Sequence, residues 1–309
     1  PLITSFVLPI LGLWNRRLVF PVSLCALSCS FGLALVLARR VLNTGPVQYF
    51  MGGWEPPWGI AFHIDHLAAL MLLLLTFVTL LVGIYSKKSI VKEVPDQEVP
   101  FYTVYLILAS GLTGLVSTAD MFNLYVFLEI TSLSCYALVS LGGGVAVVSA
   151  FRYVILGTVG AAFYLLSVGY LYSVTGSLNM ADLARLLPSL YESNAVLVGF
   201  AFFVIGISLK MALFPMHAWL PGAYSNAPSA VSALIAGTTT KVAAYVLVRV
   251  MFFVFEPSFS IDTLPVTTVL SWMAAIAMSL GSVMAIAQAD LKRMLAYSSV
   301  AQIGYIVLG

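Results

Sequence analysis

The chain has 309 residues, of which 61% are hydrophobic and only 8% are charged. A soluble globular domain is about 45–50% apolar and about 25% charged, so this composition excludes a soluble protein and indicates one that crosses a membrane several times. The net charge of +2 is small and the basic residues are scattered at segment ends, which excludes a nucleic-acid-binding surface.

Ten apolar segments approach or reach the length of about 20 residues that a membrane-spanning helix needs. In chain order they are residues 1–13, 18–38, 66–85, 100–118, 121–141, 153–175, 195–219, 229–255, 266–287 and 294–309. The first segment is short, and the last is still apolar where the sequence stops. We therefore expect an all-α polytopic membrane protein with about ten transmembrane helices, truncated relative to its full fold.

Basic residues are distributed unevenly between the loops. Loops after odd-numbered segments hold eight, and loops after even-numbered segments hold three: Arg16, Arg17, Lys87, Lys88, Lys92, Arg152, Lys292 and Arg293, against Arg39, Arg40 and Arg185. Basic residues collect on the cytoplasmic side of a membrane. This predicts a multi-pass protein of the cytoplasmic (inner) membrane with its N-terminus outside. Arg249, near the outer end of its segment, is expected to snorkel to the surface.

Two of the predicted outer loops carry local signals. Asn179 stands three residues before Asp182, which predicts a capped, short amphipathic helix along the outer face that ends near Pro188. Residues 51–59 combine Gly, Pro and Trp, which is typical of a compact turn at the membrane interface.

Three charged residues lie deep within apolar segments. Glu129 is eight residues into the fifth segment, or about 12 Å below the membrane surface. Lys210 and Lys241 are comparably deep in the seventh and eighth segments. Charged residues at this depth are costly and usually belong to an ion or proton pathway. An alternative is that Glu129 and Lys210 form a buried ion pair that only fixes helix register, but that interpretation leaves Lys241 unexplained.

The seventh segment also contains a predicted break. Pro215 removes the hydrogen bond to the carbonyl of Met211 and crowds it, and discontinuous helices near the membrane midplane mark the binding sites of many transporters. If the helix resumes, His217 falls near the face of Lys210, where its imidazole suits a proton relay. The alternative for His217 is a hydrogen-bonded packing role. In the eighth segment, the hydroxyls of the threonines before Lys241 are expected to bond locally and bend the helix.

These residues resemble a known family. The stretch Lys210-Met-Ala-Leu-Phe-Pro-Met-His-Ala-Trp-Leu-Pro-Gly-Ala-Tyr224, followed by Lys241, is similar to the core of the antiporter-like subunits of respiratory complex I, Mrp sodium/proton antiporters and membrane-bound hydrogenases. Asp120-Met-Phe-Asn-Leu-Tyr-Val-Phe-Leu-Glu129 resembles the family's fifth-helix motif, and the stretch from Asp290 to Gly304 resembles its tenth-helix entry. Residues 54–59 and 175–182 look most like the MrpD branch.

The resemblance implies a fourteen-helix fold with two inverted five-helix repeats and a broken seventh helix. Residues 1–99 would hold helices one to three, residues 100–255 the first repeat, and residues 256–309 only the start of the second. The family's proton-pathway residues carry over to Glu129, Lys210 and Lys241, and its seventh-helix histidine matches His217.

The functional hypothesis is proton transfer along this Glu-Lys-Lys axis. A carboxylate close to Lys210 favours its protonated form, so movement or neutralisation of Glu129 would release the proton through water toward Lys241. We expect a subunit of a multisubunit sodium/proton antiporter, partnered by other membrane subunits, protons and Na⁺. One alternative is a proton-pumping subunit of a redox complex, of the membrane-bound hydrogenase, formate hydrogenlyase or NADH:quinone oxidoreductase type. The other is a structural subunit with a vestigial pathway.

The sequence shows no cofactor motif and no catalytic residues, so an enzymatic role would come only through partner subunits. Cys25, Cys29 and Cys135 lie in apolar runs without a Cys/His cluster, and we expect them to be packing residues rather than metal ligands. No cofactor and no metal is predicted.

Overall fold

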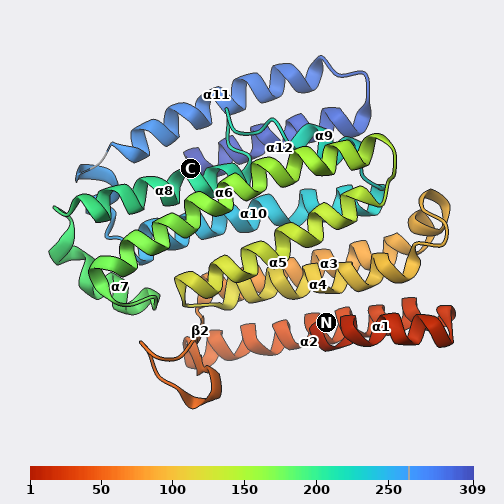
Figure 1. Ribbon diagram of the computed structural model, residues 1–309, viewed down its shortest axis with the longest axis horizontal. Coiled ribbons are helices and arrows are strands. Elements are labelled where there is room, and N and C mark those ends of the chain that lie inside the picture. Colours follow the sequence, from red (N-terminus) through yellow and green to blue (C-terminus); the bar gives the residue numbers. More distant parts are fainter. Residues whose placement is uncertain (264) are drawn as a thin grey trace.

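The structure, a computed structural model, describes residues 1–263 and 265–309. It is a bundle of long, roughly parallel helices (Figure 1). The long helices are α1 (Leu2–Trp14), α2 (Val19–Thr44), α3 (His66–Glu93), α4 (Glu98–Ser117), α5 (Met121–Ser140), α6 (Val145–Thr175), α8 (Asn194–Met211), α10 (Ser229–Phe253), α11 (Val266–Ile286) and α12 (Leu291–Leu308). The shorter elements are η1 (Arg16–Leu18), β1 (Val47–Phe50), η2 (Met51–Gly53), β2 (Ala61–Ile64), α7 (Met180–Leu186), η3 (Leu187–Leu190), α9 (Leu220–Asn226) and η4 (Phe259–Thr263).

Within the described residues, eight helices are long and apolar enough to cross a membrane: η1 with α2, then α3, α4, α5, α6, α8, α10 and α11. Two more long helices fall short of that measure. Helix α1 has 13 residues, and α12 carries Lys292 and Arg293 in its first turn, which lower its mean hydropathy. The ten predicted segments correspond to these ten helices, and the prediction of an all-α polytopic membrane protein is confirmed.

Several helices extend beyond their predicted ends. Helix α2 continues to Thr44, α3 continues to Glu93, and α6 begins at Val145. In α2 and α3 the sequence limits were placed where apolar residues stop, whereas Lys, Arg and Glu readily continue a helix that is already formed. In α6 the limit was placed after Arg152, but the helix runs through that residue from Val145. Lys87, Lys88 and Lys92 consequently lie on the last turns of α3 rather than in a loop.

The two ends of the bundle differ in character. At one end lie the connections α1–α2, α3–α4, α5–α6, α9–α10 and α11–α12, which we call the basic end (Figure 1). Polar contacts link them: Lys292 Nζ donates to the Ala227 carbonyl at 3.0 Å, and the Ser229 amide donates to Glu93 Oε2 at 2.8 Å. All the loops predicted to share one side of the membrane therefore meet at one end of the molecule.

The opposite end, which we call the hairpin end, carries β1, β2 and α7 (Figure 1). Strands β1 and β2 pair antiparallel, from Val47 with Ile64 to Phe50 with Ala61, around the turn predicted at 51–59. The extended residue Ala119 then donates to the carbonyl of Ala61 and accepts from the amide of Met180, both at 2.9 Å. The hairpin, the α4–α5 connection and the start of α7 are thus hydrogen-bonded into one layer. The short α7, capped by Asn179, is as predicted.

One continuous hydrophobic core runs through the bundle, with close helix contacts at small residues. Between α6 and α8, a Cβ added at Gly206 would lie 2.8 Å from the carbonyl oxygen of Gly160, so only glycine permits this approach. The contact fixes α8, the helix that carries Lys210, against α6.

Candidate functional site

Glu129 of α5 and Lys210 of α8 form an ion pair inside the bundle. The Nζ atom of Lys210 lies 3.0 Å from Oε1 of Glu129, and the exposed fractions of the two side chains are 6% and 22%. Glu129 lies near the middle of α5, so the pair is close to the midplane of the bundle. The expectation that these two residues are neighbours is met.

A third residue, Ser132, completes the surroundings of the lysine. Its Oγ accepts a hydrogen bond from Lys210 Nζ at 2.7 Å. Ser132 was not predicted from the sequence, although its spacing of three residues from Glu129 places both on one face of α5. With Glu129 and Ser132 as acceptors, two of the three ammonium protons of Lys210 are accounted for.

The predicted helix break is present, but it begins earlier than Pro215. Helix α8 ends at Met211, and Ala212 adopts the left-handed conformation with φ 57° and ψ 41°. The amide of Leu213 then bonds to the carbonyl of Ser208 at 3.0 Å, which closes the helix end in the manner of a Schellman motif. The expectation that the proline itself starts the break is therefore wrong. The chain leaves the helix at Ala212, and Pro215 lies within the irregular segment that follows.

The carbonyl of Leu209 near the end of α8 accepts from the Ala212 amide and gains a second partner in an aromatic side chain. Trp219 Nε1 donates to the carbonyl of Leu209 at 3.1 Å, and the indole is stacked on Tyr153 with ring centroids 4.0 Å apart. Non-helical backbone at membrane depth requires such internal partners. Residues 212, 213 and 219 of the irregular segment are buried, whereas Pro215 and Ala218 are exposed.

Lys241 lies midway along α10, the neighbour of α8. Its Nζ donates to the carbonyl of Ala236 at 2.8 Å, and among the described residues no carboxylate lies within ion-pair distance of it. The preceding threonines bond locally as predicted, Thr238 to the Leu234 carbonyl and Thr239 to the Ile235 carbonyl. The structure therefore brings Glu129 and Lys210 into contact and leaves Lys241 as a separate lysine position.

His217 lies in the irregular segment rather than on a helix. Helix α9 starts only at Leu220, so the condition under which His217 would share a face with Lys210 is not met. Its ring is stacked on Phe214 and approaches Tyr297 of α12 edge-on. Nδ1 is buried and has no hydrogen-bond partner among the described residues.

A second buried ion pair, which was not predicted from the sequence, lies toward the hairpin end. Arg249 of α10 contacts both carboxylate oxygens of Asp65, at 2.6 and 2.7 Å, and Asp65 also caps α3 by accepting from the Ala68 amide. The prediction that Arg249 snorkels to the surface is wrong, because its side chain is only 10% exposed. Asp65 gives the guanidinium a partner, so it has no need to reach water.

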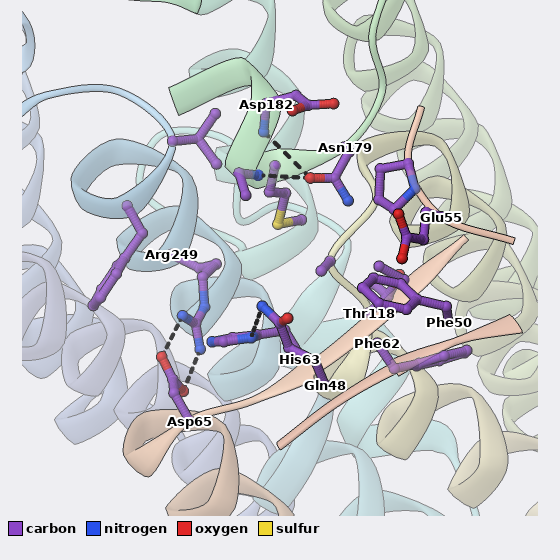
Figure 2. Close-up of a pocket in the computed structure, with 17 residues that line it drawn as sticks. Gln48, Phe50, Glu55, Phe62, His63, Asp65, Thr118, Asn179, Asp182 and Arg249 are labelled. Atoms are coloured by element: carbon purple, nitrogen blue, oxygen red, sulfur yellow. Dashed lines mark hydrogen bonds and ion pairs between the residues drawn. The ribbon is translucent and has the colours of Figure 1, made fainter. Parts of the chain in front are cut away.

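These two residues lie at the floor of a cavity of about 500 Å³ (Figure 2). Figure 2 shows Arg249 facing Asp65, with His63 and Gln48 beside them. Burial raises the pKa of Asp65, but the hydrogen bonds donated by Arg249 and the Ala68 amide outweigh it and hold that pKa at about 2. Burial lowers the pKa of His63, an effect that Asp65 opposes and Arg249 reinforces.

Comparison with known families identifies the chain. Residues 118–309 match the family described as "NADH:quinone oxidoreductase/Mrp antiporter, TM". The chain belongs to this family. Residues 57–88 also match the family described as "NADH-Ubiquinone oxidoreductase (complex I), chain 5 N-terminus". The resemblance drawn from the motifs around Glu129, Lys210 and Lys241 is confirmed.

Individual relatives come from both branches of the family. The chain is 49% identical over 296 residues to NADH-quinone oxidoreductase subunit N of Desulforudis audaxviator, a match covering 96% of this chain and 58% of that protein. It is 30% identical over 310 residues to a subunit of the Na(+)/H(+) antiporter of Bacillus subtilis, covering 100% of this chain and 62% of that protein. The chain therefore spans 58–62% of the length of these relatives.

Solved structures agree on the fold. A chain of the membrane-bound sulfane sulfur reductase, an archaeal respiratory membrane complex, superposes with a TM-score of 0.93 and 33% identity, over 100% of this chain and 62% of that one. A chain of the Mrp complex from Dietzia sp. gives a TM-score of 0.88 and 27% identity, over 99% of this chain and 56% of that one. The protein is a multi-pass membrane protein with the fold of an antiporter-like subunit.

Proposed function

We propose that the chain translocates protons through the membrane interior along Glu129, Lys210 and Lys241. The observation that carries this proposal is the contact between Glu129 and Lys210 at mid-bundle, with Lys241 on the adjacent helix and without a carboxylate partner among the described residues. A pair that only fixed helix register would not require a further lysine inside α10. Ionisable residues buried in a membrane bundle are costly and mark proton relays.

The proposed cycle has two states. In the first, Glu129 and Ser132 accept hydrogen bonds from the ammonium of Lys210, as in the structure. In the second, Glu129 is protonated or displaced, and Lys210 releases its proton through water to Lys241, whose amine has by then passed on its own proton and is unprotonated. Lysine suits this task because burial readily changes its proton affinity, whereas arginine keeps its proton at all physiological pH values.

We further propose that α4, α5, α6, α8 and α10 form the first of two inverted five-helix repeats. On this division, residues 1–99 supply the peripheral helices and residues 256–309 open the second repeat. The overlap with 56–62% of each related solved chain supports this reading. The remaining helices, including any further charged position, would belong to the rest of the fold.

The favoured partners are the membrane subunits of a redox-driven proton pump in the cytoplasmic membrane. The 49% identity to a NADH-quinone oxidoreductase subunit supports this more strongly than the 30% identity to an antiporter subunit supports the alternative. A Na⁺/H⁺ antiporter complex is the second candidate, since the antiporter relative from Bacillus subtilis matches along the full length of this chain. Purification of the native complex separates the two: iron–sulfur subunits support the first, and their absence beside antiporter subunits supports the second.

The direct test of proton transfer is substitution of Lys210 in the assembled complex. In inverted membrane vesicles, Lys210→Ala should abolish proton-coupled transport, measured with a pH-sensitive dye, and Lys210→Arg should restore little of it. Lys88→Ala, at an exposed lysine of the basic end, is the matched control and should be neutral. Normal transport by an assembled Lys210→Ala complex would show that Lys210 is only structural.

A further inference from the structure

The cavity at the hairpin end is lined by four separate parts of the chain. They are the hairpin, the α4–α5 connection, the start of α7 and the last turns of α10, represented by His63, Thr118, Asp182 and Arg249 in Figure 2. Polar groups from all four face the space, although most of the bundle surface is apolar. Such a cavity is suited to water and small hydrated ions.

The floor of this cavity is held rigidly. Besides its two contacts with Asp65, the guanidinium of Arg249 donates from Nε and Nη2 to the hydroxyl oxygen of Tyr245 at 3.2 and 2.9 Å. The ring of Phe253 lies 4.7 Å from its central carbon. The Asp65 carboxylate is equally fixed, because it also caps α3. Neither charge can turn away without losing several partners.

Below the floor, α10 leads directly toward the proposed proton axis. Lys241, Tyr245 and Arg249 are spaced four residues apart, so they follow one side of the helix over about 12 Å. The hydroxyl of Tyr245, besides accepting from Arg249, donates to the carbonyl of Val116 in α4 at 3.0 Å. A tyrosine tied to α4 and an ion pair tied to α3 thus stand between the cavity and Lys241.

We propose that the Asp65–Arg249 pair is a seal that separates a hydrated vestibule at the hairpin end from the buried lysine axis. On this proposal, the fixed bidentate pair blocks the route from the cavity along α10 toward Lys241. Because Asp65 balances the charge of Arg249, the block is steric. The consequence for transport rests on the proposed function: without the seal, protons would leak along Lys241 instead of following the coupled route. A pair that merely joins α3 to α10 would not control access to the residues beneath it.

Accessibility of Tyr245 tests the seal without reference to transport. In the complex lacking Cys25, Cys29 and Cys135, Tyr245→Cys should react slowly with an impermeant cationic thiol reagent applied to right-side-out vesicles. Adding Arg249→Gln should speed that reaction at least tenfold. A cysteine at Ala181, which lines the cavity, should react quickly in both backgrounds and confirms that the reagent reaches this face.

Two further variants keep the test decisive. If Arg249→Gln alone fails to assemble, Asp65→Asn with Arg249→Gln leaves no unpaired buried charge, and Asn still caps a helix. Arg185→Gln, in the exposed pair with Asp182 at the same end, is the control and should leave the labelling rate unchanged. Equal labelling of Tyr245→Cys with and without the pair would overturn the seal.

Passive proton conductance separates this proposal from the function it builds on. Arg249→Gln should raise the proton leak of vesicles several-fold, and Lys241→Ala in the same chain should reduce that leak. Faster labelling without any added leak would support the seal and contradict proton transfer through Lys241. A leak unaffected by Lys241→Ala, together with faster labelling, would lead to the same conclusion.

Discussion

At the scale of single residues, Lys210 and Lys241 differ in what surrounds their ammonium groups. Lys210 has a carboxylate and a hydroxyl as acceptors, whereas Lys241 has one backbone carbonyl. Lys210 is therefore suited to hold a proton while Glu129 is charged, and Lys241 to receive it when Glu129 is not. On the proposed function, this division of roles would make the Glu129–Lys210 contact the switch of the cycle.

If Glu129 and Lys210 act as a switch, their substitutions must be strongly non-additive. Glu129→Gln should displace the pH profile of transport as well as lower its amplitude, because it removes the counter-charge of Lys210. Adding Glu129→Gln to Lys210→Ala should cause no further loss. The measurement is a double-mutant cycle on transport rate across pH, with assembly checked for each variant. Additive losses with an unmoved pH profile would require the switch to be abandoned.

The vestibule contains a residue whose protonation should loosen the hairpin. Neutral His63 accepts a hydrogen bond at Nδ1 from the side-chain amide of Gln48 at 3.2 Å. Protonation turns Nδ1 into a donor, so this hydrogen bond is lost. Because burial lowers the pKa of His63, its contribution to stability is complete above the unfolded value of about 6.5 and is lost as the pH falls. Asp65, with its pKa at about 2, stays charged over that range, so the seal itself should not respond.

Hydrogen exchange can measure this effect locally. Corrected for intrinsic rates, protection of the amides in residues 47–64 should fall as the pH is lowered below about 6.5, the unfolded pKa of histidine. In His63→Asn, which keeps a polar side chain that does not titrate, the same amides should show no such change. A fall of equal size in the variant would mean that another group is responsible.

The cost of burying charge explains which of these residues could be predicted from the sequence. Glu129, Lys210 and Lys241 stood out because ionisable residues inside apolar segments are rare. The Asp65–Arg249 pair did not, since both residues lie near segment ends, where water is normally available. Only the tertiary arrangement, which brings the start of α3 against the end of α10, shows that they are shielded.

At the scale of elements, the end of α8 is where the fold departs most from regular structure. A left-handed alanine costs about 1 kcal/mol relative to glycine, and Ala212 is fully buried in that conformation. The proline-rich stretch after Lys210 correctly indicated a break. Its starting residue was not predictable, because alanine is a strong helix former and gives no signal for a left-handed cap.

The strain at Ala212 gives a prediction with a matched control. Ala212→Gly should raise the free energy of unfolding by up to about 1 kcal/mol, because glycine adopts this conformation freely. Ala223→Gly, at an equally buried alanine inside α9, should lower it by about 1 kcal/mol. Thermal unfolding of the detergent-solubilised protein would show shifts of opposite sign. A loss of stability in both variants would mean that packing of the Ala212 methyl group outweighs the strain.

The β-hairpin was the element that sequence reasoning did not anticipate. The strands Val47–Phe50 and Ala61–Ile64 have four residues each and ten residues between them, too few and too far apart for a clear alternating pattern. The intervening Gly, Pro and Trp residues revealed the turn but not the pairing. The hairpin is stabilised by the residues around Ala119 and Met180, which are distant in sequence.

At the scale of the whole molecule, charge separates the two ends. The eight basic residues of the odd-numbered loops were assigned to one side by counting alone. They lie in the connections at the basic end or on the helix turns near them (Figure 1). Such clustering follows from the sequence because each span reverses the chain direction. Which end faces the cytoplasm depends on the membrane, and it remains a prediction from the positive-inside rule.

Site-directed labelling decides that orientation. In a background without Cys25, Cys29 and Cys135, a cysteine replacing Lys88 would mark the basic end, and a cysteine replacing Ser189 would mark the hairpin end. Both native side chains are exposed, so neither change should disturb packing. In intact cells, an impermeant thiol reagent should label the Ser189 position only; in inverted vesicles, it should label the Lys88 position only. The reverse pattern would place the vestibule in the cytoplasm, and the Asp65–Arg249 seal would then close the axis from the inside. Labelling of both positions from one side would contradict the arrangement of the helices, because the two positions lie at opposite ends of the bundle.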